Sequence, residues 1–288
     1  MILSIDLGNF NVKTSEGVKF SSNFTVLDLA SENFDTNILT YNGISYSMDK
    51  KDAFELEFNK AERNYIPNLL YALAKSCGEE VTEVKLILGV PISNIGLRDR
   101  FKQDLEGKTF TFKVRGEEKE RTITISKLGV LPEGMSSFYA LPSAEREKDL
   151  LIIDIGGRTV NLATFRDKKA EKKTSLPVGT INLYNTIAER FNIMGNNIMI
   201  YEVENAINKG YIPEEIYKPC YEDFIDSIFN SIKLIANLDL YQKVWITGGG
   251  AMVLRELIKP RNEKIDCMEN PLFSNVSGNK KVALAQWK

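Results

Sequence analysis

The chain has 288 residues, of which 43% are hydrophobic and 26% are charged. These values are typical of folded globular proteins and exclude the disordered and fibrous classes, and the length predicts one large or two medium domains. Lys and Arg number 37 against 39 Asp and Glu. This balance excludes a broad electrostatic surface for nucleic acid, so we expect no direct nucleic-acid contact.

The sequence contains no histidine, which excludes Ser-His-Asp and Cys-His catalysis and zinc sites that need histidine ligands. Its three cysteines, Cys77, Cys220 and Cys267, lie far apart and form no CxxC pair, a pattern typical of reduced thiols in a cytosolic protein. No basic leader precedes the first apolar stretch, and no apolar run reaches 18 residues. We therefore expect a cytoplasmic protein without a signal peptide or membrane contact.

The first half of the chain begins with apolar stretches that predict strands. Residues 2–7 indicate a buried strand, and residues 8–11 a tight turn. Short alternating stretches follow and predict a small strand-rich subdomain at about 20–62. A helix is predicted over 65–75, with Ile66, Leu69, Leu70 and Leu73 on one face.

Two further strand patterns complete this half. The near-continuous apolar run at 84–90 ends at Pro91 and is typical of a strand covered on both faces. Residues 108–125 alternate and predict a hairpin around Gly116.

The second half begins after the charged segment 143–149, where we place a domain boundary before a buried strand at 150–155. Apolar spacing predicts one amphipathic helix through residues 183–191 and a stronger one over 221–238, whose apolar stripe we assign to the core. Strands that alternate with helices predict an α/β architecture.

An internal repeat relates the two halves. The stretch IDLGNFNVK at 5–13 aligns with IDIGGRTVN at 153–161, an offset of 148 residues and about half the chain. A repeat of this length predicts two pseudo-symmetric domains. We set their limits at residues 1–147 and 148–271, with a helical subdomain at about 182–240 in the second.

Each copy of the repeat predicts a strand followed by a glycine-containing turn. Glycine lets backbone N–H groups approach a ligand closely, and successive N–H groups form an anion-binding concavity. Further donors would come from Asn9, Asn11, Lys13, Arg158 and Thr159. One such turn is weak evidence, because a plain hairpin or bulge selects similar residues, and Thr159 could equally be a strand residue without a ligand. Two copies at a half-chain offset favour phosphate binding.

Asp6 and Asp154 end the two repeated strands. Carboxylate oxygens are the ligands that Mg²⁺ prefers, and this ion usually keeps several of its waters. The two aspartates are therefore predicted to hold Mg²⁺ through water.

A third glycine cluster, Gly248-Gly249-Gly250, follows a strand pattern at 244–247. Consecutive glycines indicate a place that the backbone approaches closely, either a ligand or a crowded strand-to-helix turn. We expect a helix from about Ala251, whose N-terminus would favour a nucleotide.

The ordered motifs DLGNFNVK, PEGMSSFYAL, DIGGRTVNL and ITGGGA resemble those of the actin/Hsp70/sugar-kinase superfamily. Within it they look most like bacterial actin-like plasmid-segregation proteins of the ParM/StbA type. The resemblance implies an α/β, actin-like (ribonuclease H-like) two-domain fold with a nucleotide cleft between pseudo-symmetric halves. The nucleotide-binding residues that it implies are Asp6, Gly8, Asn9, Asn11, Lys13, Gly156, Gly157, Arg158, Thr159, Gly179, Gly248, Gly249 and Gly250.

The resemblance also implies catalytic residues. The segment 131–135 is similar to one in which relatives carry a Glu or Gln facing the attacking water, which gives this role to Glu133, with Asp154 acting through the metal shell. Glu133 could instead be a turn residue after Pro132. Residues 272–278 resemble the segment that returns to the first domain, so 272–288 are assigned there. Arg158 and Asn161 depart from the usual pattern of small and acidic residues, which leaves the individual metal and phosphate contacts open.

The implied function is an ATP-dependent, filament-forming ATPase that requires Mg²⁺, with GTP as the alternative nucleotide. Its implied partners are further copies of itself and a DNA-bound adaptor through which it segregates plasmid DNA, in a bacterial and plasmid-encoded setting. Two alternatives stay open. The opening MILSIDLGNFNVK also resembles type III pantothenate kinases, although the chain has no GADR-like motif for a second substrate. The other is an actin-like scaffold without a plasmid role.

Overall fold

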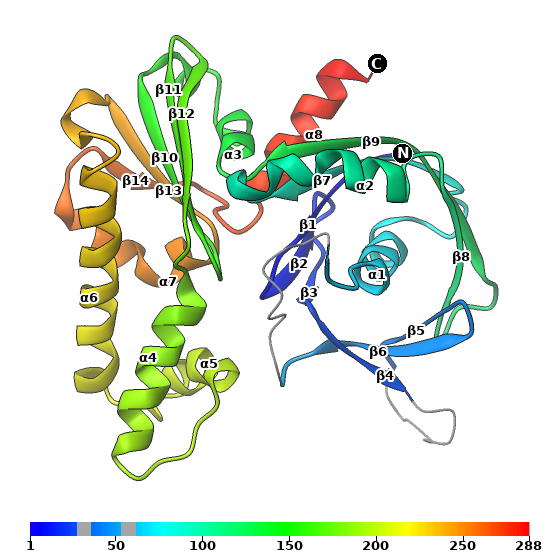
Figure 1. Cartoon of the computed structure of the whole chain (residues 1–288), viewed down its shortest axis with the longest axis horizontal. Helices are drawn as coiled ribbons and strands as arrows, with labels where there is room; N and C mark the ends of the chain where they lie inside the picture. The colour runs from blue at the N-terminus through cyan, green and yellow to red at the C-terminus, as the bar shows by residue number, and fades with distance from the viewer. Residues whose placement is uncertain (28–35, 53–61, 288) are drawn as a thin grey trace. The chain divides into compact units, whose positions relative to one another are not determined.

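A computed structural model describes residues 1–27, 36–52 and 62–287 (Figure 1). The chain divides into two compact units, which we call the first unit (Met1–Tyr139 with Asn275–Lys288) and the second unit (Ala140–Ser274). The strand-rich subdomain predicted at about 20–62 falls in part on residues 28–35 and 53–61, which lie outside the described residues. The domain limits inferred from the sequence stay a prediction.

The described strands of the first unit form a nine-stranded sheet in the order β3-β2-β1-β7-β9-β8-β5-β6-β4. The strands are β1 (Ile2–Leu7), β2 (Asn11–Thr14), β3 (Lys19–Ser21), β4 (Asn23–Leu27), β5 (Ile38–Tyr41), β6 (Ile44–Lys50), β7 (Glu83–Val90), β8 (Thr109–Val114) and β9 (Arg121–Pro132). β7 lies parallel to both β1 and β9, and the other pairs are antiparallel. β1 and β7 are almost wholly buried, which explains why their sequences are continuous apolar runs and confirms the strands predicted there.

The sheet of the first unit curves around helix α1 (Ile66–Ser76) (Figure 1). Its curvature brings β3 to the end of β6, where the backbone N–H of Ser21 donates to Asp49 Oδ1 at 2.6 Å. All residues of α1 from Pro67 to Ala74 are buried. The helix prediction is confirmed, but α1 is buried all round rather than on the single face that the spacing of its leucines indicates.

Among the described residues, four further helices occur between or after these strands in the chain. They are the 3₁₀ helix η1 (Ile92–Leu97), α2 (Arg98–Leu105), α3 (Met135–Ala140) and α8 (Ser274–Gln286). The hairpin predicted around Gly116 is confirmed by the pairing of β8 with β9, and Gly116 has the positive φ of 93° that its turn requires.

The described strands of the second unit form a five-stranded sheet in the order β12-β11-β10-β13-β14. They are β10 (Leu150–Ile155), β11 (Val160–Arg166), β12 (Lys169–Leu176), β13 (Lys243–Thr247) and β14 (Ile265–Cys267). All six residues of β10 are buried, as the sequence predicted. The edge strand β12 is mostly exposed and carries four charged residues in KAEKKTSL, which disfavours pairing with the edge of another sheet.

Helices and short 3₁₀ turns complete the second unit. They are η2 (Glu145–Glu147), α4 (Thr180–Ile193), η3 (Ile200–Glu202), α5 (Val203–Asn208), α6 (Glu214–Lys233), η4 (Leu238–Leu240), α7 (Gly249–Ile258) and η5 (Lys259–Arg261). The helix predicted over 221–238 is right in its core stripe but wrong at both ends, because α6 begins at Glu214 and ends at Lys233. The chain then turns through η4, so Leu238 lies outside the helix, and Asn237 caps that turn by accepting from the N–H of Asp239 at 3.0 Å.

The two sheets share one arrangement. In each, the first strand of the repeat pairs with an antiparallel strand on one side (β2 or β11) and with a parallel strand on the other (β7 or β13). A third antiparallel strand extends the hairpin, as β3 or β12. The repeat in the sequence is thus a repeat of structure, and the α/β, two-sheet fold is confirmed. Among the helices that the structure describes, none has the length and apolar character needed to cross a bilayer.

Candidate functional site

The first repeated turn connects β1 to β2. Asp6 lies near the carboxyl end of β1, opposite Lys13 on β2 and Gly89 on β7. Lys13 Nζ is 2.8 Å from Asp6 Oδ2, and both side chains are largely buried. A Cβ on Gly8 would lie 2.4 Å from the carbonyl oxygen of Asn11, so the tight turn predicted here accepts only glycine at that position.

Arg63, which the sequence did not single out, holds this turn from a distant part of the chain. Its guanidinium donates to the carbonyl oxygens of Leu7 and Gly8, and the residue is 6% exposed. Ser22 adds a second support, because its hydroxyl donates to the carbonyl of Asn9 at 2.5 Å. The backbone of the turn is therefore fixed from outside the motif, while Asn11 lies half-buried at the start of β2.

Glu133 lies directly after β9 and is buried. Its backbone N–H donates to the carbonyl of Val90 at 2.7 Å, which ties it to the end of β7. The next residue, Gly134, has a φ of +74° and donates to Asn275 Oδ1 on α8 at 2.9 Å. Ser137 donates to the same oxygen at 2.8 Å. Helix α8 thus fixes the turn that carries Glu133, a role of Asn275 that the motif alone does not reveal.

The second repeated turn connects β10 to β11. Asp154 lies opposite Asn161 on β11 and Thr247 on β13. The backbone N–H of Gly156 donates to the carbonyl of Thr159 at 2.8 Å and closes the turn. Thr159 lies in this turn and directly precedes β11, so it is a turn residue rather than a strand residue, and its role toward a ligand stays a prediction.

Asn161, which stands where the resemblance predicts an acidic residue, forms hydrogen bonds that support the same turn. The Asn161 amide nitrogen donates to Thr159 Oγ1 at 3.3 Å, and Ser175 on β12 donates to Asn161 Oδ1 at 2.5 Å. Asn161 therefore braces the turn against the neighbouring strand. Arg158 lies half-buried at the tip.

Helix α4 begins against the second turn. The N–H groups of Thr180 and Ile181 donate to the carbonyls of Gly156 and Gly157 at 3.0 and 2.9 Å. A Cβ on Gly179 would lie 2.3 Å from the carbonyl oxygen of Gly157. Close packing therefore accounts for glycine at 179, and its role toward a nucleotide stays a prediction.

The three glycines after β13 have different surroundings. Gly248 has a φ of +85°, and a Cβ there would lie 2.4 Å from Asp154 Oδ1. A Cβ on Gly250 would lie 2.2 Å from Ile155 Cγ2, whereas one on Gly249 would meet, among the described residues, only Leu272, at 3.9 Å. Crowding against β10 thus explains the first and third glycines. Gly249 is half-buried and opens α7, which begins two residues earlier than predicted from Ala251.

Each unit offers one buried aspartate whose carboxylate oxygens suit magnesium. Asp6 in the first unit and Asp154 in the second are each 4% exposed. In the described part of the chain, no three His, Cys, Asp or Glu side chains gather as a metal site. A bound Mg²⁺ would therefore take most of its oxygens from water and phosphate, as it does in many nucleotide sites.

The cysteines supply no nucleophile. Burial raises the pKa of the Cys77 thiol to about 11, and it also raises the pKa values of Cys220 and Cys267. All three are free and, at neutral pH, remain thiols rather than the thiolate that nucleophilic catalysis needs.

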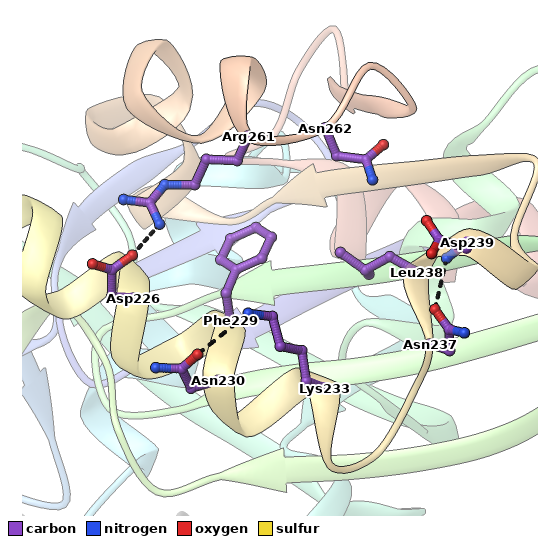
Figure 2. Close-up of a pocket in the computed structure, with 9 residues that line it drawn as sticks. All are labelled: Asp226, Phe229, Asn230, Lys233, Asn237, Leu238, Asp239, Arg261 and Asn262. Atoms are coloured by element: carbon purple, nitrogen blue, oxygen red, sulfur yellow. Dashed lines mark hydrogen bonds and ion pairs between the residues drawn. The ribbon is translucent and has the colours of Figure 1, made fainter.

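A surface hollow beside α6 contains none of the predicted site residues. Its lining residues come from α6, from the turn around η4 and from the end of η5: Asp226, Phe229, Asn230, Lys233, Asn237, Leu238, Asp239, Arg261 and Asn262 (Figure 2). Arg261 forms an ion pair with Asp226 across it, and the other two charges, Lys233 and Asp239, are of opposite sign. This mixture gives no single-sign field that would attract a phosphate.

Comparison with known proteins places the chain in a structural class. A family model described as actin-like proteins, N-terminal domain, matches residues 4–135. A comparison with curated protein sequences finds no match.

Solved structures are similar over nearly the whole chain. An archaeal actin homolog in complex with ADP has a TM-score of 0.84 at 18% identity, covering 99% of both chains. A ParM filament from Clostridium botulinum, described as 15-stranded, has a TM-score of 0.81 at 19% identity, also covering 99% of both chains. The actin-like protein Alp7A has a TM-score of 0.74 at 16% identity, covering 99% of this chain and 96% of that one. The chain therefore has the actin-like fold, and its residues 4–135 match the family model of the actin-like N-terminal domain.

Proposed function

We propose that this protein is an ATP-dependent, filament-forming actin-like ATPase that segregates plasmid DNA through a DNA-bound adaptor. The observation that carries the proposal is the repeated geometry of the two sheets. Each has a buried aspartate near the carboxyl end of a strand, followed by a glycine-containing turn and an antiparallel strand, with a parallel strand on the other side. Ligands of α/β sheets typically bind at the carboxyl ends of parallel strands.

The two turns are proposed to bind the phosphates of the nucleotide. Backbone N–H groups around Gly8 and Gly156 would face phosphate oxygens, as successive N–H groups do in anion-binding turns. Lys13 would add a positive charge, and Asp6 and Asp154 would hold Mg²⁺ through its water shell. When bound, the metal would neutralise charge on the phosphates.

The start of α7 is proposed to lie near the nucleoside. Gly249 is the glycine of its cluster that packing does not crowd, so its backbone can be approached by a ligand. The positive end of a helix dipole favours a nearby nucleotide. ATP is the proposed nucleotide, with GTP as the alternative.

Glu133 is proposed to orient the attacking water. Its backbone is fixed between β7 and α8, which sets the place from which its side chain starts. Hydrolysis of a phosphoanhydride needs alignment of the water and stabilisation of charge rather than a covalent nucleophile. A chain without histidine or a reactive thiol can supply both.

Assembly and DNA contact are proposed to be separate steps. The partner in assembly is a second copy of the chain, and the solved ParM filament with the same fold supports this choice. The balanced charge provides little general attraction for DNA phosphates, so an adaptor would make the DNA contact.

High-speed pelleting combined with phosphate release tests the proposal. We expect the protein to sediment with ATP·Mg²⁺ and to remain in the supernatant without nucleotide or with excess EDTA. Asp154→Asn should weaken both responses, and Asp99→Asn, an exposed aspartate at the start of α2, is the matched control. Turnover that appears only when pantothenate or another acceptor metabolite is added, without sedimentation, would contradict the proposal and favour a kinase.

A further inference from the structure

The side chain of Asn279, on α8 in the first unit, is fully buried. Neither its amide nitrogen nor its amide oxygen has a hydrogen-bond partner among the described residues. Buried polar groups in folded proteins are almost always satisfied, because leaving one unpaired is costly. A carboxamide with both ends unpaired therefore indicates a small polar ligand at this place.

Two acidic side chains lie near the unpaired Asn279 amide, around Gly89. A Cβ placed on Gly89 would lie 3.5 Å from Asn279 Nδ2, 3.8 Å from Glu133 Cγ and 4.0 Å from Asp6 Cβ. All three are ordinary contact distances, so the three side chains surround a point over Gly89 that a methyl group could occupy. Glu133 Cγ and Asp6 Cβ are each one bond from a carboxylate carbon. The space is thus bounded by an unpartnered amide and by two acidic side chains.

We propose that this space holds a buried water molecule that Asn279 binds and through which Asn279 orients the carboxylate of Glu133. A carboxamide offers both a donor and an acceptor, and a buried water typically makes about three hydrogen bonds to otherwise unsatisfied groups. Asn279 is accordingly a positioning residue, four residues along α8 from Asn275, which fixes the backbone after Glu133. The role toward Glu133 rests on the proposed function, whereas the water site does not.

A crystal structure at a resolution that shows ordered water is the first test. The wild type should show a water within hydrogen-bonding distance of the Asn279 amide, and Gly89→Ala should lack it because the added methyl fills the space. A wild-type structure with no water at Asn279 would overturn the proposal. A water present in a protein that hydrolyses no nucleotide would support the site while contradicting the proposed function.

Steady-state kinetics test the positioning role. Gly89→Ala and Asn279→Ala should each lower kcat at least about fivefold, because a small misplacement of a catalytic group has large effects on rate. The nucleotide Kd should stay within about twofold, since neither change removes a group assigned to nucleotide contact. The double variant should be no slower than the slower single variant, because both changes remove the same water. Gly96→Ala is the matched control, because a Cβ there meets no described residue within 4 Å and its φ is not positive.

Other outcomes of the kinetic test would overturn the positioning role. These are an unchanged kcat in Gly89→Ala despite loss of the water, or fully additive effects in the double variant. If Asn279→Ala does not fold, Gly89→Ala still decides the question, because its methyl group makes only ordinary contacts.

Discussion

The ammonium group of Lys13 lies 2.8 Å from Asp6 Oδ2, across the hairpin formed by β1 and β2. The sequence assigned separate tasks to these residues, phosphate binding to Lys13 and metal binding to Asp6. In the structure each neutralises the other within a largely buried pair. Binding of a Mg²⁺–nucleotide would therefore have to break the ion pair between Lys13 and Asp6. Lys13 would then pair with the phosphates, and Asp6 with the hydrated metal.

Lys13→Met tests this pair in the absence of any ligand. Removing one partner from a buried pair leaves the other insufficiently compensated, so we expect the free energy of unfolding to fall by about 1–3 kcal/mol. Chemical denaturation measures the change. Lys218→Met, which breaks an exposed pair with Glu214, is the control and should leave stability nearly unchanged. Equal effects of the two substitutions would contradict the buried, structural role of the Lys13–Asp6 pair.

Arg63→Lys tests the support of the first turn. A lysine keeps the charge but cannot donate to two carbonyls with the planar fork of a guanidinium. We expect weaker ATP·Mg²⁺ binding, by roughly tenfold if one hydrogen bond from a charged group is lost. Isothermal titration or a fluorescent nucleotide measures it, and the exposed Arg98→Lys is the control. Wild-type affinity in a folded Arg63→Lys variant would show that the turn does not depend on this residue.

Gly248→Ala should lower the stability of the protein, whereas Gly249→Ala should weaken nucleotide binding without loss of stability. A methyl group on Gly248 meets Asp154 Oδ1 at 2.4 Å on a backbone with positive φ, so this variant should lose at least about 1 kcal/mol of stability. Gly249→Ala meets only Leu272 and should fold normally, but its methyl group should obstruct the nucleotide and raise the Kd. Thermal unfolding and nucleotide titration of both variants provide the comparison. The reverse pattern would remove Gly249 from the proposed site.

Much of the fold was accessible from the sequence, because the central strands are covered on both faces and therefore consist of continuous apolar residues. The runs at β1, β7 and β10 are examples. Helix limits were less accessible. Apolar residues continue at helical spacing from α6 through Leu238. The helix nevertheless ends at Lys233, because the chain has to turn toward β13. The apolar pattern of the sequence does not reveal this tertiary requirement.

The site was accessible only where its residues lie inside the repeated motifs. Asp6 and Asp154 could be proposed because each lies one residue before the end of a strand that precedes a glycine-containing turn. Arg63 and Asn275 could not, because they act on carbonyls and N–H groups of residues 55 or more positions away. Asn279 was missed for a related reason. Its lack of a hydrogen-bond partner results from how the surrounding residues pack, which the sequence does not show.

Glu133→Ala should separate hydrolysis from assembly. Its side chain is assigned to the attacking water rather than to the nucleotide, so ATP binding and assembly should remain while phosphate release slows severalfold or more. Filaments of the variant should outlive those of the wild type after ATP is depleted. Glu118→Ala, an exposed residue between β8 and β9, is the control. Unchanged phosphate release in Glu133→Ala would assign the residue to the turn alone.

Light scattering of the wild-type protein, recorded together with phosphate release across a wide range of protein concentrations, tests the central claim most directly. With excess ATP·Mg²⁺ we expect scattering to rise above a critical concentration and then to decay as phosphate accumulates. Without nucleotide the signal should stay flat. A protein that remains monomeric at every concentration in the presence of ATP·Mg²⁺ would contradict the account.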